Sequence, residues 1–374
     1  MQQIAQLTGL RFIAAFGVVI CHFARAVDLP EWALFITDFF GSFVMLFFVL
    51  SGFVLTINYP QLKNLEKNYF IEYAAGRLAR ILPVYWLALM LMLLLYLILG
   101  FPSFDRSVFQ WEGAFAVNFL AIQAWMPNIF MQQAWNAPGW SVSSELFFYA
   151  CLPLLLKCSW LDGTYKGIIR LWLILLIMLL FYWLVVLNLP QALELDIPFL
   201  LIFPSRLPVF GLVCFGYGVN LAKTYAIKKD KIEVPRKYLG SILFTILILP
   251  IAWLCFLFKS ISIYGSVFEI FCVYGIFTPF FCLVIHRLIW SKNWTTKLLS
   301  SEIFIYLGSA SYSLYLIHWI ALAFLMFHTN PKHAVFNGWM LILVCIVFSM
   351  LIYQFFEDPL RKKIRYALIN FSKT

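Results

Sequence analysis

The sequence predicts an all-α, polytopic membrane protein in which the whole chain, residues 1–374, forms one integral-membrane domain. Of its 374 residues, 63% are hydrophobic and only 12% are charged, whereas a soluble domain carries about 25% charged residues. The apolar residues gather in runs of membrane-spanning length, and the basic residues gather between alternate runs. These three observations exclude a soluble globular fold, and no segment outside the runs is long enough for a separate domain.

About ten apolar stretches are near the 17–25 residues that a helix needs to cross the hydrocarbon core of a bilayer. The first is too long for a removable signal peptide and lacks a cleavage site, so we expect a permanent span. The predicted spans lie at residues 10–28, 36–58, 82–100, 142–156, 169–189, 206–222, 239–258, 264–286, 303–327 and 338–356.

The segment 101–141, which is rich in Trp and Pro, is expected to form a short cap on the outer side of the membrane. Its apolar part, residues 114–126, is shorter than a span and contains Asn118 and Gln123. We therefore interpret it as a re-entrant or surface helix, because an eleventh span would divide the basic loops between the two sides of the membrane.

The net charge of +10 comes from the loops on one side of this arrangement. Together with Arg11, the intervals 59–81, 157–170, 223–237, 287–302 and 357–374 hold 22 of the 27 Lys and Arg residues. The positive-inside rule then places these loops and both termini in the cytoplasm. The excess of positive charge therefore indicates topology and not a nucleic-acid partner.

The eight cysteines indicate neither a metal site nor a disulfide framework. All of them lie in or beside apolar runs, and none forms a CxxC pair. They are expected to be small buried hydrophobic residues.

Arg11 and His22 lie in the first span, with only apolar residues or glycine between them apart from Cys21. Eleven positions correspond to about three helical turns, so both side chains share one face, about 16 Å apart along the axis. An imidazole at this depth is costly, which favours a functional role, and it can take a proton from a hydroxyl. The alternative is a histidine that joins two helices by a hydrogen bond.

Arg77 and Arg80 are three residues apart and therefore neighbours on one face of a helix. They are predicted on the same side of the membrane as Arg11. Three converging guanidinium groups would suit a phosphate-bearing ligand. The alternative is ordinary topology-setting charge.

The run WSVSSE at 140–145 leads into the fourth predicted span. Ser141 resembles an N-cap, and Glu145 lies about one turn into the helix, where its carboxylate could orient His22 or a substrate hydroxyl. The alternative is an acid favoured by the helix dipole.

Three further polar sites have simpler interpretations. Ser51 and Gly52 are expected to allow close helix packing. His318 lies in the ninth predicted span beside Tyr312 and Tyr315, whose hydroxyls could satisfy it as a structural histidine. The tail at 356–363 is expected to be a basic cytoplasmic anchor.

Taken together in chain order, these pieces resemble acyltransferase family 3, a family of membrane-bound acyltransferases that modify bacterial surface glycans. Met45 departs from the pattern, because many relatives carry an acid there. The matching pieces are Arg11 with His22, FFVLSGF at 47–53, Arg77 and Arg80 before Pro83 and Tyr85-Trp86, WSxSxE at 140–145, RLPxF at 206–210, SYSLYLxHW at 311–319 and FEDP at 356–359.

The resemblance implies transfer of an acetyl or other short acyl group from cytoplasmic acyl-coenzyme A to a hydroxyl of a glycan or lipid-linked sugar. It implies that His22 is the general base or a transient acyl carrier and that Glu145 orients it or binds the acceptor. Arg11, Arg77 and Arg80 would bind the donor, which is a substrate and not a permanently bound cofactor. The candidates for the substrate path are Ser141, Ser143, Arg206 and His318.

The expected location is the bacterial inner membrane, and the sequence leaves the oligomeric state open. Two other functions remain open at this point. One is a transporter or flippase of a lipid-linked sugar, and the other is a related acyltransferase that acts on a small-molecule hydroxyl.

Overall fold

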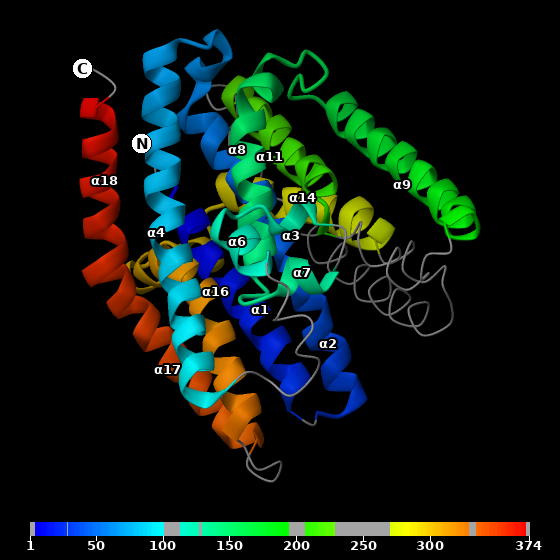
Figure 1. Cartoon of the computed structure of the whole chain (residues 1–374). Coiled ribbons are helices and arrows are strands. Elements are labelled where there is room, and N and C mark those ends of the chain that lie inside the picture. The colour runs from blue at the N-terminus through cyan, green and yellow to red at the C-terminus, as the bar shows by residue number, and fades with distance from the viewer. Residues whose placement is uncertain are drawn as a thin grey trace.

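The computed structural model describes residues 4–27, 29–100, 113–126, 129–193, 206–228, 270–328 and 334–371, and these contain helices and no strand. Eight helical stretches in this part of the chain are long and apolar enough to cross a membrane. Their arrangement in one bundle is shown in Figure 1. The longer helices are α1 (Ala5–Ala26), α2 (Glu31–Gly41), α3 (Phe43–Asn58), α4 (Lys67–Leu99), α8 (Gly139–Lys157), α9 (Tyr165–Leu193), α11 (Pro208–Lys228), α14 (Thr278–Trp290), α16 (Glu302–His328), α17 (Ala334–Ile352) and α18 (Asp358–Phe371).

The prediction of an all-α membrane bundle is confirmed. Nine of the ten predicted spans overlap helices in the described chain, whereas the predicted span at 239–258 lies outside the described residues. The remaining elements are short or have a different helical pitch. They are η1 (Pro60–Asn64), α6 (Ala114–Phe119), η2 (Gln123–Trp125), α7 (Ile129–Gln133), η4 (Phe271–Phe277), α15 (Trp294–Leu299) and η6 (Tyr353–Glu357).

The described part of 113–126 is too short to cross the bilayer, as predicted. Six residues of α6 and one turn of η2 fold against the side of α4. Asn118 and Gln123 are buried there, and Gln123 donates a hydrogen bond to the Tyr85 hydroxyl at 3.0 Å. The polar residues that argued against a span therefore attach this segment to the bundle.

Helix α4 begins fifteen residues before its predicted start at residue 82 and continues through Pro83. The reason is that its first half also buries side chains, among them Tyr73 and Ala79. Proline is tolerated inside a membrane helix when neighbouring helices support the bend. Arg77 and Arg80 are therefore held within a continuous helix and not in a loop.

Helices α1 and α16 lie side by side and run in the same direction, since Thr8 contacts Gly308 and His22 contacts His318. A Cβ atom at Gly308 would collide with the carbonyl oxygen of Thr8. Small residues at such contacts let membrane helices approach closely. This contact places the two histidine-bearing helices next to each other.

Helices α3 and α11 make a second close contact through Gly52 and Gly218, where a Cβ would collide with the backbone of the facing helix. The predicted packing role of Gly52 is therefore confirmed. The opposite face of α3 is free to line the interior of the bundle.

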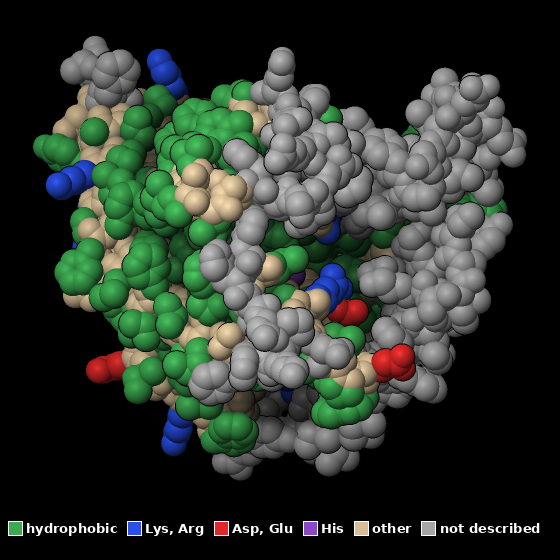
Figure 2. Space-filling view, turned by 60° about the horizontal axis from the view of Figure 1, so that its bottom comes forward, with side chains coloured by type: hydrophobic (Ala, Val, Ile, Leu, Met, Phe, Trp, Pro, Cys, Tyr) green, Lys and Arg blue, Asp and Glu red, His purple; other side chains and the backbone are tan. Residues whose placement is uncertain are grey.

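Large apolar side chains cover the outside of the bundle, as Figure 2 shows for one face of the molecule. Leu97 of α4, Ile177 of α9 and Val347 of α17 are each more than half exposed. Exposed apolar surface on several helices is typical of contact with lipid chains. The buried polar residues, by contrast, concentrate where α1, α3, α4, α8 and α16 meet.

Candidate active site

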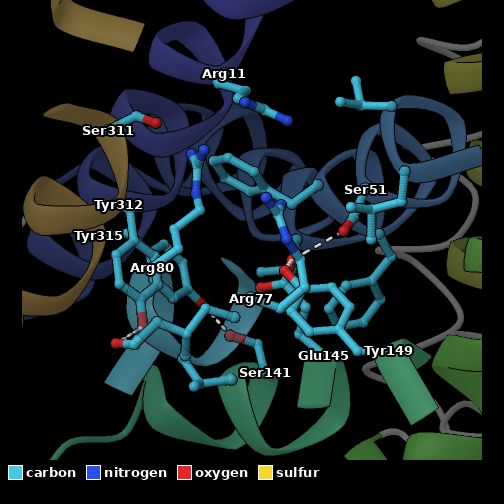
Figure 3. A pocket seen from close by; sticks show the side chains of 17 residues that line it. Arg11, Ser51, Arg77, Arg80, Ser141, Glu145, Tyr149, Ser311, Tyr312 and Tyr315 are labelled. Carbon is cyan, nitrogen blue, oxygen red and sulfur yellow. Dashed lines mark hydrogen bonds between the residues drawn. The ribbon is translucent and has the colours of Figure 1, made fainter. Parts of the chain in front are cut away.

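A cavity of about 80 Å³ lies between α1, α3, α4, α8 and α16. Its polar lining includes three arginines and one carboxylate, and Figure 3 shows the guanidinium groups of Arg11, Arg77 and Arg80 turned toward the same part of it. The predicted convergence of these three arginines is thus confirmed. Arg77 and Arg80 meet because they lie three positions apart on one helix.

The three guanidinium groups form no ion pair with any acid among the described residues. Arg77 is buried, donates to the Tyr59 hydroxyl at 3.4 Å and lies 5.5 Å from the centre of the Tyr59 ring. Its Nε atom is buried without a hydrogen-bond partner. An unmatched donor of this kind is costly unless a ligand satisfies it.

A second cavity, of about 240 Å³, shares Arg11, Arg77 and Arg80 with the first. It extends toward the N-terminal end of α1, where Ile4 and Arg361 line it. The three arginines therefore stand between a wider basic mouth and a narrower inner cavity. This is the geometry that an elongated ligand with one anionic end would fit.

Glu145 accepts two hydrogen bonds within the inner cavity, from the Ser51 hydroxyl at 2.9 Å and from the Tyr149 hydroxyl at 2.6 Å. The sequence analysis assigned Ser51 to helix packing only and so missed this contact. A hydroxyl within an otherwise apolar span was the signal that could have found it.

Ser141 is not an N-cap, because α8 begins at Gly139 and the Ser141 hydroxyl donates to the carbonyl oxygen of Pro138 at 2.9 Å. The sequence misled here because Pro138 and Gly139 already belong to the helix start. Ser141 does line the cavity, where its hydroxyl lies 2.9 Å from that of Tyr315.

His22 is paired with His318 and not with Glu145. The Nδ1 atom of His22 lies 2.8 Å from Nε2 of His318, and the two rings are nearly coplanar, edge to edge, with centroids 5.1 Å apart. The edge of Trp319 packs against the His22 ring. The expected hydroxyl partners of His318 are therefore replaced by a second imidazole.

The histidine pair lies beyond the lining of both cavities. Tyr315 joins the two regions, since it lines the inner cavity and its ring centre lies 6.0 Å from that of His318. Arg11 thus lines the cavity and His22 does not, so the expectation that both side chains open onto one path is only partly met. The side chain of Tyr315 thus lies between the cavity and the ring of His318.

The other candidates for the substrate path lie outside the cavity lining. Ser143 accepts a hydrogen bond from the amide of Ala124 at 3.3 Å, which ties η2 to α8. Arg206 lies over the Trp140 ring at 5.8 Å and against the amide of Gln133. Figure 2 shows a hollow in which a histidine and charged side chains are visible among the described atoms.

Comparison with known proteins decides the family, because the model of the family described as "Acyltransferase domain" matches residues 4–355. The chain belongs to acyltransferase family 3. The eight long apolar helical stretches in its described part fit a multi-pass membrane protein.

Two relatives show how far this similarity extends. "Putative O-acetyltransferase SACOL0978" of Staphylococcus aureus (strain COL) is 27% identical over 393 aligned positions, which cover 97% of this chain and 58% of that protein. "Acyltransferase MdmB" of Streptomyces mycarofaciens is 29% identical over 157 residues, which cover 41% of this chain and 39% of that protein. The chain thus matches little more than half the length of these relatives at most, and no solved structure gives a significant match.

Glu357, in the segment predicted to be a basic anchor, is a buried acid for which the sequence predicted no role. It lies on the π-helical turn η6, is 1% exposed and accepts a hydrogen bond from Ser313 at 2.7 Å. The next acid, Asp358, instead pairs with Arg361 and Lys362. The buried acid thus lies on the π-helical turn, whereas Lys362 and Lys363 after it are exposed.

Among the described residues, no group of three His, Cys, Asp or Glu side chains could hold a metal ion. The groups that this part of the chain brings to the site are arginine, carboxylate, hydroxyl and imidazole.

Proposed function

We propose that this chain is a plasma-membrane O-acyltransferase that takes an acetyl or other short acyl group from acyl-coenzyme A. The acceptor would be a hydroxyl of a cell-surface glycan or of a lipid-linked sugar. The observation that carries the proposal is the set of three arginines, against a single carboxylate in the cavity lining, between the basic mouth and the inner cavity. Coenzyme A has several phosphate groups at one end and its thioester at the end of a long narrow arm.

The phosphates would bind Arg11, Arg77 and Arg80, since the planar guanidinium group matches phosphate oxygens with paired hydrogen bonds. The unpartnered Nε of Arg77 supports this assignment. The pantetheine arm would then occupy the inner cavity, whose lining is largely apolar beyond the arginines. Movement of Tyr315 would bring the thioester to the histidine pair.

His22 would act as general base. The acceptor hydroxyl gives its proton to the imidazole as its oxygen bonds to the thioester carbonyl carbon. The carbon–sulfur bond then breaks, and the coenzyme A sulfur takes the proton back from the imidazolium. Proton transfer of this kind contributes about 10²–10⁴-fold to rate.

The test is transfer from radiolabelled acetyl-coenzyme A by purified protein in proteoliposomes that contain membrane glycolipid from the producing cell. We expect His22→Ala to lose about 10²-fold or more of the wild-type rate. The matched control is His286→Ala, because His286 lies on α14 and lines neither cavity. Unchanged transfer by His22→Ala would refute the assigned base, and no transfer by the wild type would refute the function.

The proposed orientation places the basic mouth in the cytoplasm, where acyl-coenzyme A is made. A reporter fused after residue 160 should then report the cytoplasm, and one fused after residue 130 should report the outside. The opposite result would place the arginines on the side of the membrane that lacks the donor.

A further inference from the structure

The two ring nitrogens of His318 have different partners, and this difference fixes where its hydrogen lies. Nδ1 is 3.2 Å from the carbonyl oxygen of Leu314. A carbonyl oxygen can only accept a hydrogen bond, so Nδ1 of His318 carries a hydrogen. In a neutral imidazole the other nitrogen, Nε2, is then an acceptor.

The atom that Nε2 of His318 meets is Nδ1 of His22, at 2.8 Å. With Nε2 as acceptor, Nδ1 of His22 must be the donor. The lone pair of the His22 ring is therefore on Nε2. The chain of bonds runs from His22 through His318 to the backbone of α16, with every hydrogen pointing the same way.

The neutral state of His318 follows from its position. The ring is fully buried, and its edge faces a second imidazole at an interplanar angle of 10°. A charge on His318 would be desolvated and would repel any charge that His22 gains during the reaction. Arg25 and Arg206 are the other cations that act electrostatically on His22, and they too disfavour an additional positive charge on the histidine pair.

We propose that His318 is a positioning residue that holds His22 in the tautomer whose Nε2 is free to take a proton. The positioning role rests on the proposed function of His22, whereas the assignment of the tautomer does not. The hydrogen bond from His22 to His318 also sets the plane of the His22 ring, which lies at 80° to the ring of Trp319. When His22 takes a proton on Nε2, its Nδ1–H bond to His318 is unchanged and helps to stabilise the imidazolium.

The alternative is that His318 only fills space between α1 and α16. In that case either tautomer of His22 would be acceptable. The side chain at 318 would then matter for its volume and not for its hydrogen-bond acceptor.

The first test measures the tautomer directly, by nitrogen-15 NMR of the full-length protein in nanodiscs with labelled histidine. The chain has only five histidines, so the signals of His22 and His318 can be assigned from His22→Gln and His318→Gln. We expect both rings to carry hydrogen on Nδ1 and not on Nε2 at pH 7.5. Hydrogen on Nε2 of His22 would overturn the inference whether or not the protein transfers acyl groups.

The second test compares two replacements of similar size. The side-chain oxygen of glutamine can take the place of Nε2 as acceptor, whereas leucine cannot accept at all. We expect His318→Gln to keep most of the wild-type kcat and the Nδ1–H tautomer of His22. His318→Leu should lose about 10²-fold in kcat with an unchanged KM for acetyl-coenzyme A.

If both replacements reduce kcat equally while NMR shows the same His22 tautomer as in the wild type, the role of His318 is packing and the inference fails. Failure of His22→Ala to reduce transfer would instead refute the proposed function. The two failures are therefore distinguishable.

Discussion

The arginines of the cavity and those on the outer surface of this protein have opposite electrostatic surroundings. On the surface, Arg25 lies 2.8 Å from Asp38, Arg170 lies 3.2 Å from Asp162, and Arg365 lies 2.6 Å from Glu72. In the cavity, Arg77 and Arg80 form no ion pair with any described acid, although water is scarcer there.

Stability alone would favour the reverse arrangement. A buried charge without a partner costs several kcal/mol, whereas an exposed ion pair contributes at most about 1 kcal/mol. The inner cavity thus has three cations and one carboxylate in its lining, and an anionic ligand would balance this excess of positive charge. The following predictions test this difference, beginning with the largest expected effect.

The double variant Arg77→Ala with Arg80→Ala should weaken binding of acetyl-coenzyme A by about 100-fold, since each charge-assisted hydrogen bond is worth about 1.5–3 kcal/mol. The donor KM in proteoliposomes measures this. Replacing both by lysine should give an intermediate value, because the charge stays and the paired geometry is lost. An unchanged KM in the alanine variant would mean that the cavity arginines bind something else.

Adding a second acid to the cavity should reproduce part of this loss. Ser311 lines the cavity with its side chain 2% exposed. We expect Ser311→Glu to raise the donor KM about tenfold more than Ser311→Gln, which adds the same volume without charge. Equal effects of the two variants would show that volume, and not charge, limits the donor.

Tyr59 offers a smaller test, because its hydroxyl is the one protein group that accepts from Arg77 among the described residues. Tyr59→Phe keeps the ring and removes the hydroxyl, so we expect the donor KM to change about twofold to threefold. Tyr69→Phe is the control, since Tyr69 contacts Tyr59 but lines neither cavity. A larger effect from Tyr69 would contradict the assignment.

The smallest effect is expected for Arg170→Ala on the surface. The change in stability should be small, as for other exposed pairs, and the donor KM should not change. The pKa of Asp162 is lowered chiefly by hydrogen bonds from Thr164 and less by Arg170. Most of the stabilisation by ionised Asp162 should therefore remain in the variant. This stabilisation is present above the unfolded-state pKa of Asp162 and is lost as the pH falls through the folded-state pKa. Thermal melts between pH 3 and 7 would measure it.

The sequence was most informative where the relevant geometry lies within one helix. Arg77 and Arg80 are three positions apart, so their shared face follows from helical periodicity alone. The membrane class and the short helices at 113–126 likewise follow from hydropathy and length. Gly52 was correctly expected at a helix contact, although its partner on α11 could not be named.

The sequence was least informative where two distant helices meet. His22 and His318 are 296 positions apart, and nothing in either segment specifies which ring nitrogen faces the other. Ser51 was interpreted with Gly52 because the two are adjacent, but adjacent helical residues point in different directions, and Ser51 faces Glu145. Glu357 was missed because its inward direction depends on a π-helical turn that hydropathy does not reveal.

The most direct test of the account is a cryo-electron microscopy structure of the full-length protein in nanodiscs with bound coenzyme A. We expect the phosphates within hydrogen-bonding distance of Arg11, Arg77 and Arg80, and the pantetheine arm in the inner cavity with its sulfur toward Tyr315. Coenzyme A bound away from these arginines, or with its sulfur toward the N-terminal end of α1, would contradict the account.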